Sequence, residues 1–259
     1  MSTPRQRSRT EAARRVRVKS RVLRVAKQLE NFLGVPRQTH PLPPPLDMLI
    51  ATILSQNTND KNSYRAYTEL RKRFTGWDEV ARAPLHRLKA AIVSGGMANQ
   101  KAARIKEILA TIKQRYGAYD LSSLAHKSNE AVIEELVRFN GVGLKTASCV
   151  LLFSLGRDVF PVDTHVHRIC NRLGFVNDSR TPEATFEMMK PLIPKGRGYS
   201  FHTNLIRFGR MVCRSSQPRC HLCPLFDKCR YEGKSARRKQ TAPTASGAEH
   251  SFMLLDNVR

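Results

Sequence analysis

Four cysteines near the C-terminal end of the chain have the spacing of a metal or iron–sulfur site. Cys213, Cys220, Cys223 and Cys229 are separated by six, two and five residues. Four thiolates this close along the chain can converge on one ion or cluster, and the chain then wraps around it. The surrounding segment is basic and contains little that would build a core. A buried metal centre would hold it folded, and we predict a [4Fe–4S] cluster bound by these four thiolates.

Three other interpretations of the four cysteines stay open from sequence. A pair of disulfides suits secreted proteins, and nothing in this chain indicates secretion. A structural zinc ion often takes two close-spaced pairs of cysteines, whereas one Cys-x-x-Cys occurs here. Free thiols that merely cluster are the third interpretation. The remaining cysteines, Cys149 and Cys170, lie in apolar helical patterns and are expected in the core.

A second segment with chemical potential runs from Phe139 to Ala147 and contains Gly141 and Gly143. Apolar helical patterns precede and follow it, so the glycines lie where two helices must be joined by a tight turn. Backbone N–H groups at such a turn, and at the start of the next helix, can hold a phosphate. The layout is that of a helix-hairpin-helix element, which binds the DNA backbone without reading sequence. A plain turn between helices is the alternative.

Lys145 lies at the expected start of the second helix of this element, and Thr146 follows it. A lysine beside a phosphate site can attack an electrophilic carbon as a neutral amine and form a Schiff base, although most lysines are solvated surface charges. Asp163 precedes a further helical run, where it either caps the helix or assists the lysine. A lysine with an aspartate suits cleavage of a glycosidic bond, in which a positively charged sugar develops.

The charge of the chain restricts its partners. The 259 residues carry a formal net charge of +24, and the pI is near 10.5. A polyanion is therefore the expected partner, and nucleic acid is favoured. No apolar run approaches the length of a membrane span, and the N-terminus lacks the apolar centre of a secretory signal. We expect a monomer of the cytoplasm, associated with the nucleoid and not with membranes; an Arg-rich organelle transit peptide is the alternative.

Apolar residues recur at helical spacing through most of the chain, which predicts an all-α fold. A basic helix is expected over residues 14–33, before a proline-rich connector at residues 41–45. Further helices are expected at residues 46–54, 60–74, 84–93, 100–116, 130–139, 145–155, 164–173, 182–192 and 200–212.

Three motifs together resemble the endonuclease III family, the DNA glycosylases and apurinic/apyrimidinic lyases of the helix-hairpin-helix superfamily that carry an iron–sulfur cluster. They are Gly141-Val-Gly-x-Lys-Thr-Ala, Val162-Asp-Thr-His-x-x-Arg and the six-two-five cysteine spacing. The resemblance covers roughly residues 46–229. It implies a bifunctional enzyme of base excision repair that removes oxidised pyrimidines from duplex DNA through a lysine Schiff base and β-elimination.

The resemblance also implies roles for single residues. Lys145 falls on the lysine that attacks C1′ of the damaged nucleotide, Asp163 on the catalytic aspartate, and the four cysteines on the ligands of a [4Fe–4S] cluster. Gln56 falls on the residue that fills the gap left by the flipped base. Met97 falls on the apolar wedge that props the stack apart. Without the resemblance, Gln56 is an ordinary polar residue at a helix end and Met97 a filler of gaps in the core.

The remaining DNA contacts are expected at two places. Gly141, Gly143 and Thr146 are expected to hold the DNA backbone at the hairpin. Arg214 and Arg219 are expected to meet phosphates from the loop between the first two cysteines. Both expectations place cations or backbone N–H groups against the phosphate charge.

The domain organisation follows from the same resemblance. Residues 46–154 are expected to form a six-helix, barrel-like domain with the helix-hairpin-helix element. Residues 14–45 and 155–233 are expected to form the cluster-binding helical domain, built from N- and C-terminal segments. The composition of the two ends, and not the resemblance, predicts a disordered basic tail over residues 1–13 and a polar tail over residues 234–259.

Two departures from the family pattern leave the range of lesions open. Phe139-Asn140 stands where the family usually has Leu-Pro, and Ala98 follows Met97 where an aromatic residue is usual. The alternatives kept open are a mismatch-specific thymine, uracil or adenine glycosylase of the same superfamily, and a non-catalytic iron–sulfur protein that binds DNA as a redox sensor.

Overall fold

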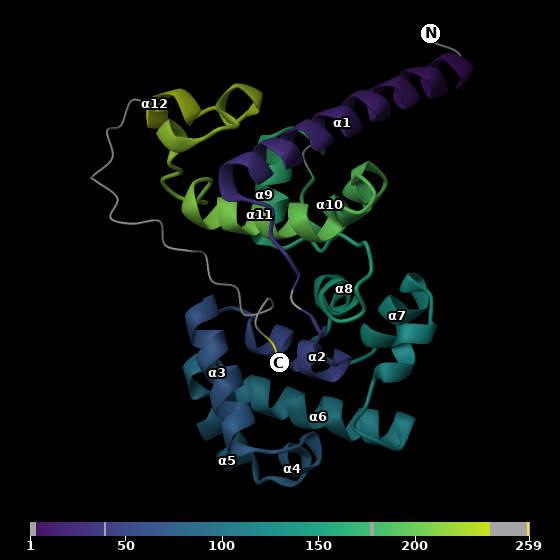
Figure 1. Cartoon of the computed structure of the whole chain (residues 1–259), viewed down its shortest axis with the longest axis vertical. Helices are drawn as coiled ribbons and strands as arrows, with labels where there is room; N and C mark the ends of the chain where they lie inside the picture. The colour runs from purple at the N-terminus through teal and green to yellow at the C-terminus, as the bar shows by residue number, and fades with distance from the viewer. Residues whose placement is uncertain (1–3, 39, 177–178, 239–257, 259) are drawn as a thin grey trace. The chain divides into compact units, whose positions relative to one another are not determined.

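The computed structural model describes residues 4–38, 40–176, 179–238 and 258. Every regular element in this described part is an α- or 3₁₀-helix, so the all-α class predicted from apolar spacing is confirmed. The chain divides into two compact units (Figure 1). Unit 1 consists of residues 1–37 and 158–251, and unit 2 of residues 38–157 and 252–259. No helix in the described residues is both long and apolar enough to cross a membrane.

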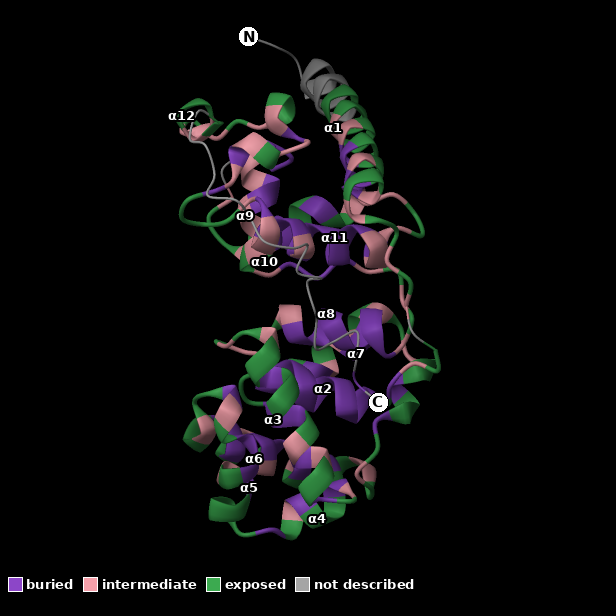
Figure 2. Ribbon diagram, turned by 60° about the vertical axis from the view of Figure 1, so that its left-hand side comes forward, coloured by how far each residue is buried: buried purple, intermediate pink, exposed green. Residues whose placement is uncertain are grey.

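Unit 2 contains the expected helix-hairpin-helix segment. Its helices are α2 (Pro45–Leu54), α3 (Asp60–Arg73), α4 (Trp77–Arg82), α5 (Leu85–Ile92), η1 (Val93–Gly95), α6 (Ala98–Tyr116), η2 (Ser122–His126), α7 (Asn129–Leu136) and α8 (Leu144–Phe153). The core forms where α2 packs on α8. All ten residues of α2 are buried, and Figure 2 shows both helices as largely buried ribbons.

A buried carboxylate ties the start of α2 to its neighbours. Asp47 accepts a hydrogen bond from the Tyr67 hydroxyl at 3.0 Å and from the Trp77 indole N–H at 3.1 Å. The Arg71 guanidinium lies over the Trp77 ring, 4.9 Å from its centroid. Because a buried charge needs hydrogen-bonding partners, this arrangement fixes α3 and α4 against α2.

Unit 1 joins the N-terminal helix to the C-terminal third of the chain. Its helices are α1 (Pro4–Leu33), α9 (Thr164–Arg172), α10 (Pro182–Met189), η3 (Lys190–Leu192), α11 (Gly198–Met211), η4 (Cys220–Leu222), η5 (Phe226–Lys228) and α12 (Lys234–Arg238). Both α1 and α9 pack on α11. Helix α1 buries Val22, Val25, Ala26 and Leu29, which recur at helical spacing.

The N-terminal helix begins earlier than its apolar pattern predicts. We expected a disordered tail over residues 1–13 and a helix from Arg14, whereas α1 already begins at Pro4. Arginine, glutamine, glutamate and alanine favour the helix, so it continues beyond the apolar stripe that buries its second half. The predicted polar tail begins with α12, and most of it, residues 239–257 and 259, lies outside the described residues.

Candidate functional site

The hairpin between α7 and α8 has an open backbone. The Val142 N–H donates to the Phe139 carbonyl at 3.0 Å, which closes the turn. Gly141 has φ +74°, a left-handed conformation that glycine adopts without strain. A β-carbon added to Gly143 would meet nothing within 4 Å. The hairpin therefore leaves the backbone open at Gly143, at the N-terminus of α8, where N–H groups have no partner within the helix.

Lys145 lies in the first turn of α8, as the glycine pattern predicted. Its side chain is half-buried, whereas the next residue, Thr146, is buried. Helix α8 then continues as an almost wholly buried helix. The amine is therefore carried by an element whose position is fixed by the core of unit 2.

Gln56 lies against the same hairpin. Its Nε2 is 3.2 Å from the Gly141 carbonyl and 3.5 Å from the Thr146 hydroxyl. Its Oε1 accepts a hydrogen bond from Arg104 Nη1 at 2.9 Å. Within unit 2 the fold thus brings together two positions that the sequence predicted separately, the glutamine after α2 and the first turn of α8.

Arg104 and Glu107 of α6 contact the hairpin between α7 and α8. A β-carbon on Gly141 would lie 2.1 Å from Arg104 Nε, so the guanidinium packs directly on the glycine backbone. Glu107 Oε2 accepts a hydrogen bond from Asn140 Nδ2 at 3.0 Å. Asn140 belongs to one of the two departures from the family pattern, and here it ties the hairpin to α6.

Met97 protrudes from a strained loop. It has φ 51°, and the preceding Gly96 has φ 69°. The left-handed conformation is uncommon for a residue with a side chain and costs on the order of 1 kcal/mol or more. The Met97 side chain is 45% exposed, and Asn57 Nδ2 is 3.7 Å from its Sδ. Met97 is therefore not a filler of the core, and its loop touches the loop that carries Gln56.

A buried lysine joins these two loops from inside. Lys101 is 2% exposed, and its Nζ donates to the Leu54 carbonyl and to the Gly95 carbonyl, each at 2.8 Å. Burial, followed by repulsion from Arg104, lowers the pKa of Lys101 to about 8. Neither Lys101 nor Arg104 was expected at the site from sequence, because a cation in a helical pattern usually indicates a solvated charge.

A surface hollow of about 640 Å³ adjoins Met97. It is lined by residues of α5, η1 and the start of α6, namely Lys89, Ala90, Val93, Met97, Ala98, Asn99 and Gln100. Val93 is 66% exposed. Alanine at position 98 therefore leaves open space beside Met97, and a larger side chain would reduce that space.

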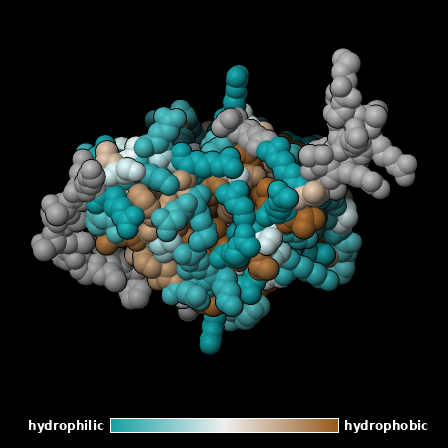
Figure 3. All heavy atoms as spheres, turned by 90° about the horizontal axis from the view of Figure 1, so that it is seen from above, coloured by the Kyte–Doolittle hydropathy of each residue, from teal (hydrophilic) through white to brown (hydrophobic). Residues whose placement is uncertain are grey.

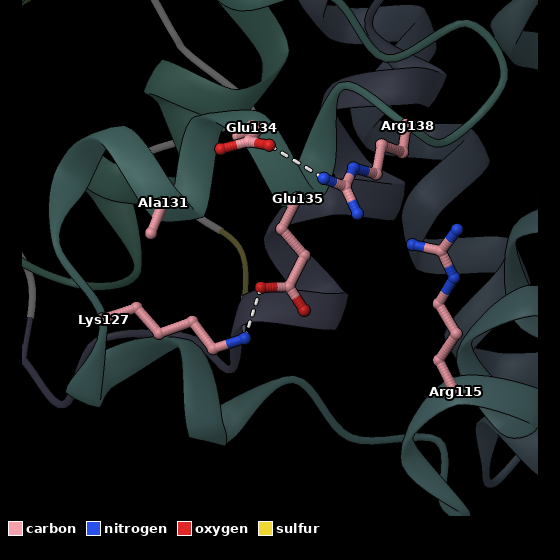
Figure 4. A pocket seen from close by; sticks show the side chains of 6 residues that line it. All are labelled: Arg115, Lys127, Ala131, Glu134, Glu135 and Arg138. Carbon is pink, nitrogen blue, oxygen red and sulfur yellow. Dashed lines mark hydrogen bonds and ion pairs between the residues drawn. The ribbon is translucent and has the colours of Figure 1, made fainter.

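Another hollow in unit 2, of about 580 Å³, is lined by Ala131, Glu134 and Glu135 of α7 together with Arg115, Lys127 and Arg138 (Figure 4). Glu135 pairs with Lys127 and accepts a hydrogen bond from the Tyr116 hydroxyl. These contacts hold α7, which leads into the hairpin, against the end of α6. We assign this hollow a structural role.

Asp163 belongs to unit 1 and is the N-cap of α9. Its Oδ1 accepts a hydrogen bond from the Val166 N–H at 2.8 Å, and the side chain is half-buried. Its charge also acts on its neighbours: it raises the pKa of Cys170 together with burial, and it opposes the burial that lowers the pKa of His165. The capping interaction predicted as the ordinary role of Asp163 is present, and it orients the carboxylate at the first turn of α9.

The four clustered cysteines lie in unit 1 as free thiols. Burial first, and then the neighbouring thiols Cys213, Cys229 and Cys220, raise the pKa of Cys223 to about 12. Burial, followed by Cys213 and Cys229, raises the pKa of Cys220 as well. Within the described ranges, no three His, Cys, Asp or Glu side chains are grouped to hold a metal ion. The thiols are therefore near enough to influence one another without being arranged around one ion.

Two arginines of α9 hold the cysteine segment, which we define as residues 213–229. Arg168 donates to the Cys213 carbonyl at 2.8 Å and to the Gly209 carbonyl at 3.1 Å. Arg172 Nη1 is 3.3 Å from Cys213 Sγ and donates to the Arg214 carbonyl at 2.8 Å. Helix α9 thus carries Asp163 at one end and anchors the cysteine segment along its length.

The two arginines predicted to meet phosphates differ in exposure. Arg214 is exposed, and its Nε donates to the Arg210 carbonyl at 3.1 Å. Arg219 is half-buried at the N-cap of η4. Both lie in the loop between Cys213 and Cys220, as the sequence requires.

The sequence of this chain matches known DNA repair proteins. Residues 50–195 match the family described as HhH-GPD superfamily base excision DNA repair protein. Endonuclease III of Thermotoga maritima is 38% identical over 200 residues, which are 76% of this chain and 89% of that protein. A putative DNA glycosylase of Arabidopsis thaliana is 39% identical over 166 residues, 64% of this chain and 57% of that protein.

The fold is also found in solved structures. A structure of endonuclease III in a non-covalent complex with DNA superposes with a TM-score of 0.73 at 28% identity, covering 85% of this chain and 99% of that one. The resemblance drawn from the three motifs is confirmed by these matches. The chain therefore belongs to the HhH-GPD superfamily of base excision DNA repair proteins.

Proposed function

We propose that the protein is a bifunctional DNA glycosylase and apurinic/apyrimidinic lyase that removes oxidised pyrimidines from duplex DNA. The observation that carries the proposal is the position of Lys145. Its amine lies in the first turn of α8, directly after an open glycine hairpin and beside Thr146, which Gln56 contacts. A phosphate held at that hairpin would bring the adjoining sugar to the lysine.

In the proposed reaction the neutral Lys145 amine attacks C1′ of the damaged nucleotide. The C1′–N bond breaks, the base leaves with its electron pair and takes up a proton, and the sugar ring opens to a Schiff base on Nζ. Loss of a C2′ proton then expels the 3′ phosphate by β-elimination, and hydrolysis releases the lysine. The step transfers no electrons to or from an outside acceptor.

Asp163 is proposed to assist the lysine. Its carboxylate is oriented by the Val166 N–H at the start of α9, so its charge has a fixed direction. A carboxylate there would stabilise the positively charged sugar that develops as the base leaves. Replacing Asp163 with asparagine keeps the capping interaction and removes the charge, which separates the two roles.

The loops around Gln56 and Met97 are proposed to open the duplex. Met97, held outward by its left-handed backbone, would enter the stack as a wedge, and Gln56 would occupy the space of the flipped base. Gly141, Gly143 and Thr146 are proposed to hold the backbone of the damaged strand, and Arg214 and Arg219 to contact phosphates from the cysteine segment.

The donor set of the cysteine segment fits a [4Fe–4S] cluster. Such a cluster takes one thiolate on each of four iron atoms, so its ligands need not surround a single point. Cys213, Cys220, Cys223 and Cys229 would hold it, and the N–H groups of Arg172 and Tyr231 already lie 3.3 Å and 3.4 Å from Cys213 Sγ and Cys229 Sγ. When bound, the cluster would supply structural order to the segment.

The test is borohydride trapping on a duplex with a single thymine glycol. The wild-type protein is expected to form a covalent adduct and to nick the strand, whereas Lys145→Gln forms none. Lys113→Gln, a change of the same kind in the last turn of α6, serves as the matched control and keeps the adduct. An adduct that survives Lys145→Gln unchanged refutes the proposed mechanism.

The same assay tests which lesions are substrates separately from whether the lyase reaction takes place. Cleavage of a duplex with a preformed abasic site, without release of thymine glycol, would retain the lyase and reject the oxidised pyrimidine as substrate. The space beside Ala98 would then be the first place to examine, and Ala98→Tyr the variant to compare.

A further inference from the structure

We propose that α1 and the end of the cysteine segment form a further nucleic-acid-binding surface in unit 1, which holds the phosphate backbone of duplex DNA. We define the α1 surface by Arg17, Arg21 and Arg24 of α1 together with Lys228 and Arg230. All five belong to unit 1, and none has a role in the reaction proposed above. The inference uses the proposed function only to identify the polyanion.

The charge of α1 is concentrated in one stretch. Residues 12–29 contain no Asp or Glu and seven cations: Arg14, Arg15, Arg17, Lys19, Arg21, Arg24 and Lys27. At 1.5 Å per residue this stretch is about 27 Å long. A rod of that length with one sign of charge matches the spacing of phosphates along a duplex better than it matches a small anion.

Three of these arginines lie along one face, because residues three and four apart are neighbours on a helix. Arg21 is fixed there: its Nη2 donates to the Leu173 carbonyl at 2.6 Å. Arg230 packs on the next residue, since a β-carbon on Gly174 would lie 2.4 Å from Arg230 Cζ. Guanidinium groups from α1 and from the residue that follows the cysteine segment therefore meet over the same turn of backbone.

The other end of the face also meets the cysteine segment. Gln28, four residues after Arg24, accepts a hydrogen bond from Lys228 Nζ at 2.9 Å and donates to the Pro224 carbonyl at 2.7 Å. Lys228 and Arg24 are both exposed. The face thus continues from α1 onto the cysteine segment, and Asp227, the residue before Lys228, is the carboxylate beside it in the sequence.

The cations on this surface repel one another. Besides burial, the groups that lower the pKa of Arg21 are Arg230 and Arg24. Glu30, which directly follows the basic stretch of α1, pairs with Arg197 and accepts a hydrogen bond from the Ser200 hydroxyl. A phosphate backbone would relieve this repulsion, because it supplies negative charge against the clustered cations.

A membrane surface fits less well than DNA. A basic helix that binds membranes inserts an apolar face between the lipids, whereas the apolar face of α1 is already buried in unit 1 through Val22, Val25 and Leu29. Hydrophilic residues cover most of the face shown in Figure 3, with hydrophobic residues scattered among them. Val16 and Leu23 are the large exposed hydrophobic residues of this part of α1, and they are not adjacent in the sequence.

The test measures binding to an undamaged duplex as a function of salt. The double variant Arg17→Ala/Arg24→Ala is compared with Arg15→Ala/Lys19→Ala, which removes the same charge from exposed positions of α1 that are not three or four residues from the three arginines of the face. Each phosphate contact contributes about 0.9 to the slope of log K against log salt, so the Arg17/Arg24 variant is expected to lower the slope by about 2. The Arg15/Lys19 variant is expected to change it by less than half as much.

Equal slopes for the two double variants, or no change in either, would overturn the proposal, because the helix would then act through net charge alone or not at all. Loss of binding to phosphatidylserine vesicles in the Arg17/Arg24 variant, with duplex binding retained, would overturn it as well. Borohydride trapping by the wild type is scored separately, so a missing adduct rejects the proposed lyase without altering the salt slopes.

Discussion

Helix α8 and the cysteine segment are held in place by different means. Eight of the ten residues of α8 are buried, and the helix packs on α2 in the core of unit 2. In the cysteine segment the buried residues are Pro218, Cys220 and Leu225, and hydrogen bonds from Arg168 and Arg172 attach it to α9. Apolar burial is the dominant stabilising term in folding, so α8 can support itself, whereas the segment needs something to bind.

This difference in packing separates the residue proposed to react from the residues proposed to bind the cluster. The lysine proposed to react lies on an element that the core alone positions, while the thiols lie on a segment whose order we expect to depend on a bound cluster. A reaction that needs no electron transfer has no use for the cluster at the lysine itself. The predictions below test whether the two regions behave as independently as their packing indicates.

The largest expected effect is on the cysteine segment. The double variant Cys220→Ser/Cys223→Ser is expected to lose the visible absorbance and the iron of the purified protein completely, because two of the four ligands are gone. Limited proteolysis is expected to cut between residues 213 and 229 in this variant. Mass spectrometry of the fragments locates the cut.

Cys149→Ala is the matched control, because Cys149 is buried in α8 and outside the cysteine segment. It is expected to keep both iron and absorbance. Zinc rather than iron in the wild-type protein, measured by elemental analysis, would instead support the structural zinc site kept open from the sequence.

The next effect concerns the core under Lys145. Leu151 is fully buried in α8, and Leu151→Ala is expected to lower the free energy of unfolding of unit 2 by about 3 kcal/mol through the cavity it leaves. Urea denaturation measures the loss. The same loss should be found after iron has been removed by a chelator; a loss that vanishes with the iron would show that α8 depends on the cluster after all.

Lys101 gives a pH-dependent test of the loops that carry Gln56 and Met97. Its pKa is about 8 in the folded protein and 10.5 ordinarily, so between these values the unfolded state binds more protons. The free energy of unfolding of the wild type, relative to Lys101→Met, is therefore expected to rise from pH 8 to pH 10.5, by up to about 3 kcal/mol. Below pH 8 the difference should stay constant.

Urea unfolding of both proteins at several pH values measures this difference. Lys113→Met, in the last turn of the same helix, is the control that removes a charge near the surface. Parallel pH profiles for the wild type and Lys101→Met would mean that Lys101 keeps an ordinary pKa despite its burial.

The smallest expected effect concerns Gln56. Its contacts with Gly141 and Arg104 are ordinary hydrogen bonds, each contributing about 1 kcal/mol. Gln56→Ala is therefore expected to lower the free energy of unfolding of unit 2 by about 2 kcal/mol. Because Gln56 is proposed to fill the space of the flipped base, the variant is also expected to bind a lesion duplex about tenfold more weakly. A loss confined to the rate of trapping at saturating protein would place Gln56 nearer to the chemistry than proposed.

Much of the fold could be predicted from the sequence, because apolar residues recur at helical spacing in long helices. The helix expected over residues 145–155 is found as α8, Leu144–Phe153, and the one over residues 46–54 as α2. Helix α4 was missed. It has six residues, too few for a period to be recognised, and it depends on Trp77 packing into unit 2.

The candidate site could be predicted only in its outward-facing parts. Gly141, Gly143 and Lys145 stand in a motif that sequence displays directly. Lys101 and Arg104 could not be found this way, since the periodicity of α6 does not tell a buried cation from a solvated one. What buries Lys101 is a pair of carbonyls at Leu54 and Gly95, distant in sequence and brought together by the fold.

The indole described in unit 2 has a practical consequence. The chain contains a single tryptophan, and Trp77 is buried there, with its N–H on Asp47 and the Arg71 guanidinium over its ring. Intrinsic fluorescence excited at the indole band therefore reports the folding of unit 2 alone, while far-ultraviolet circular dichroism records the helices of both units. Comparing the two optical signals during denaturation resolves each unit without a label.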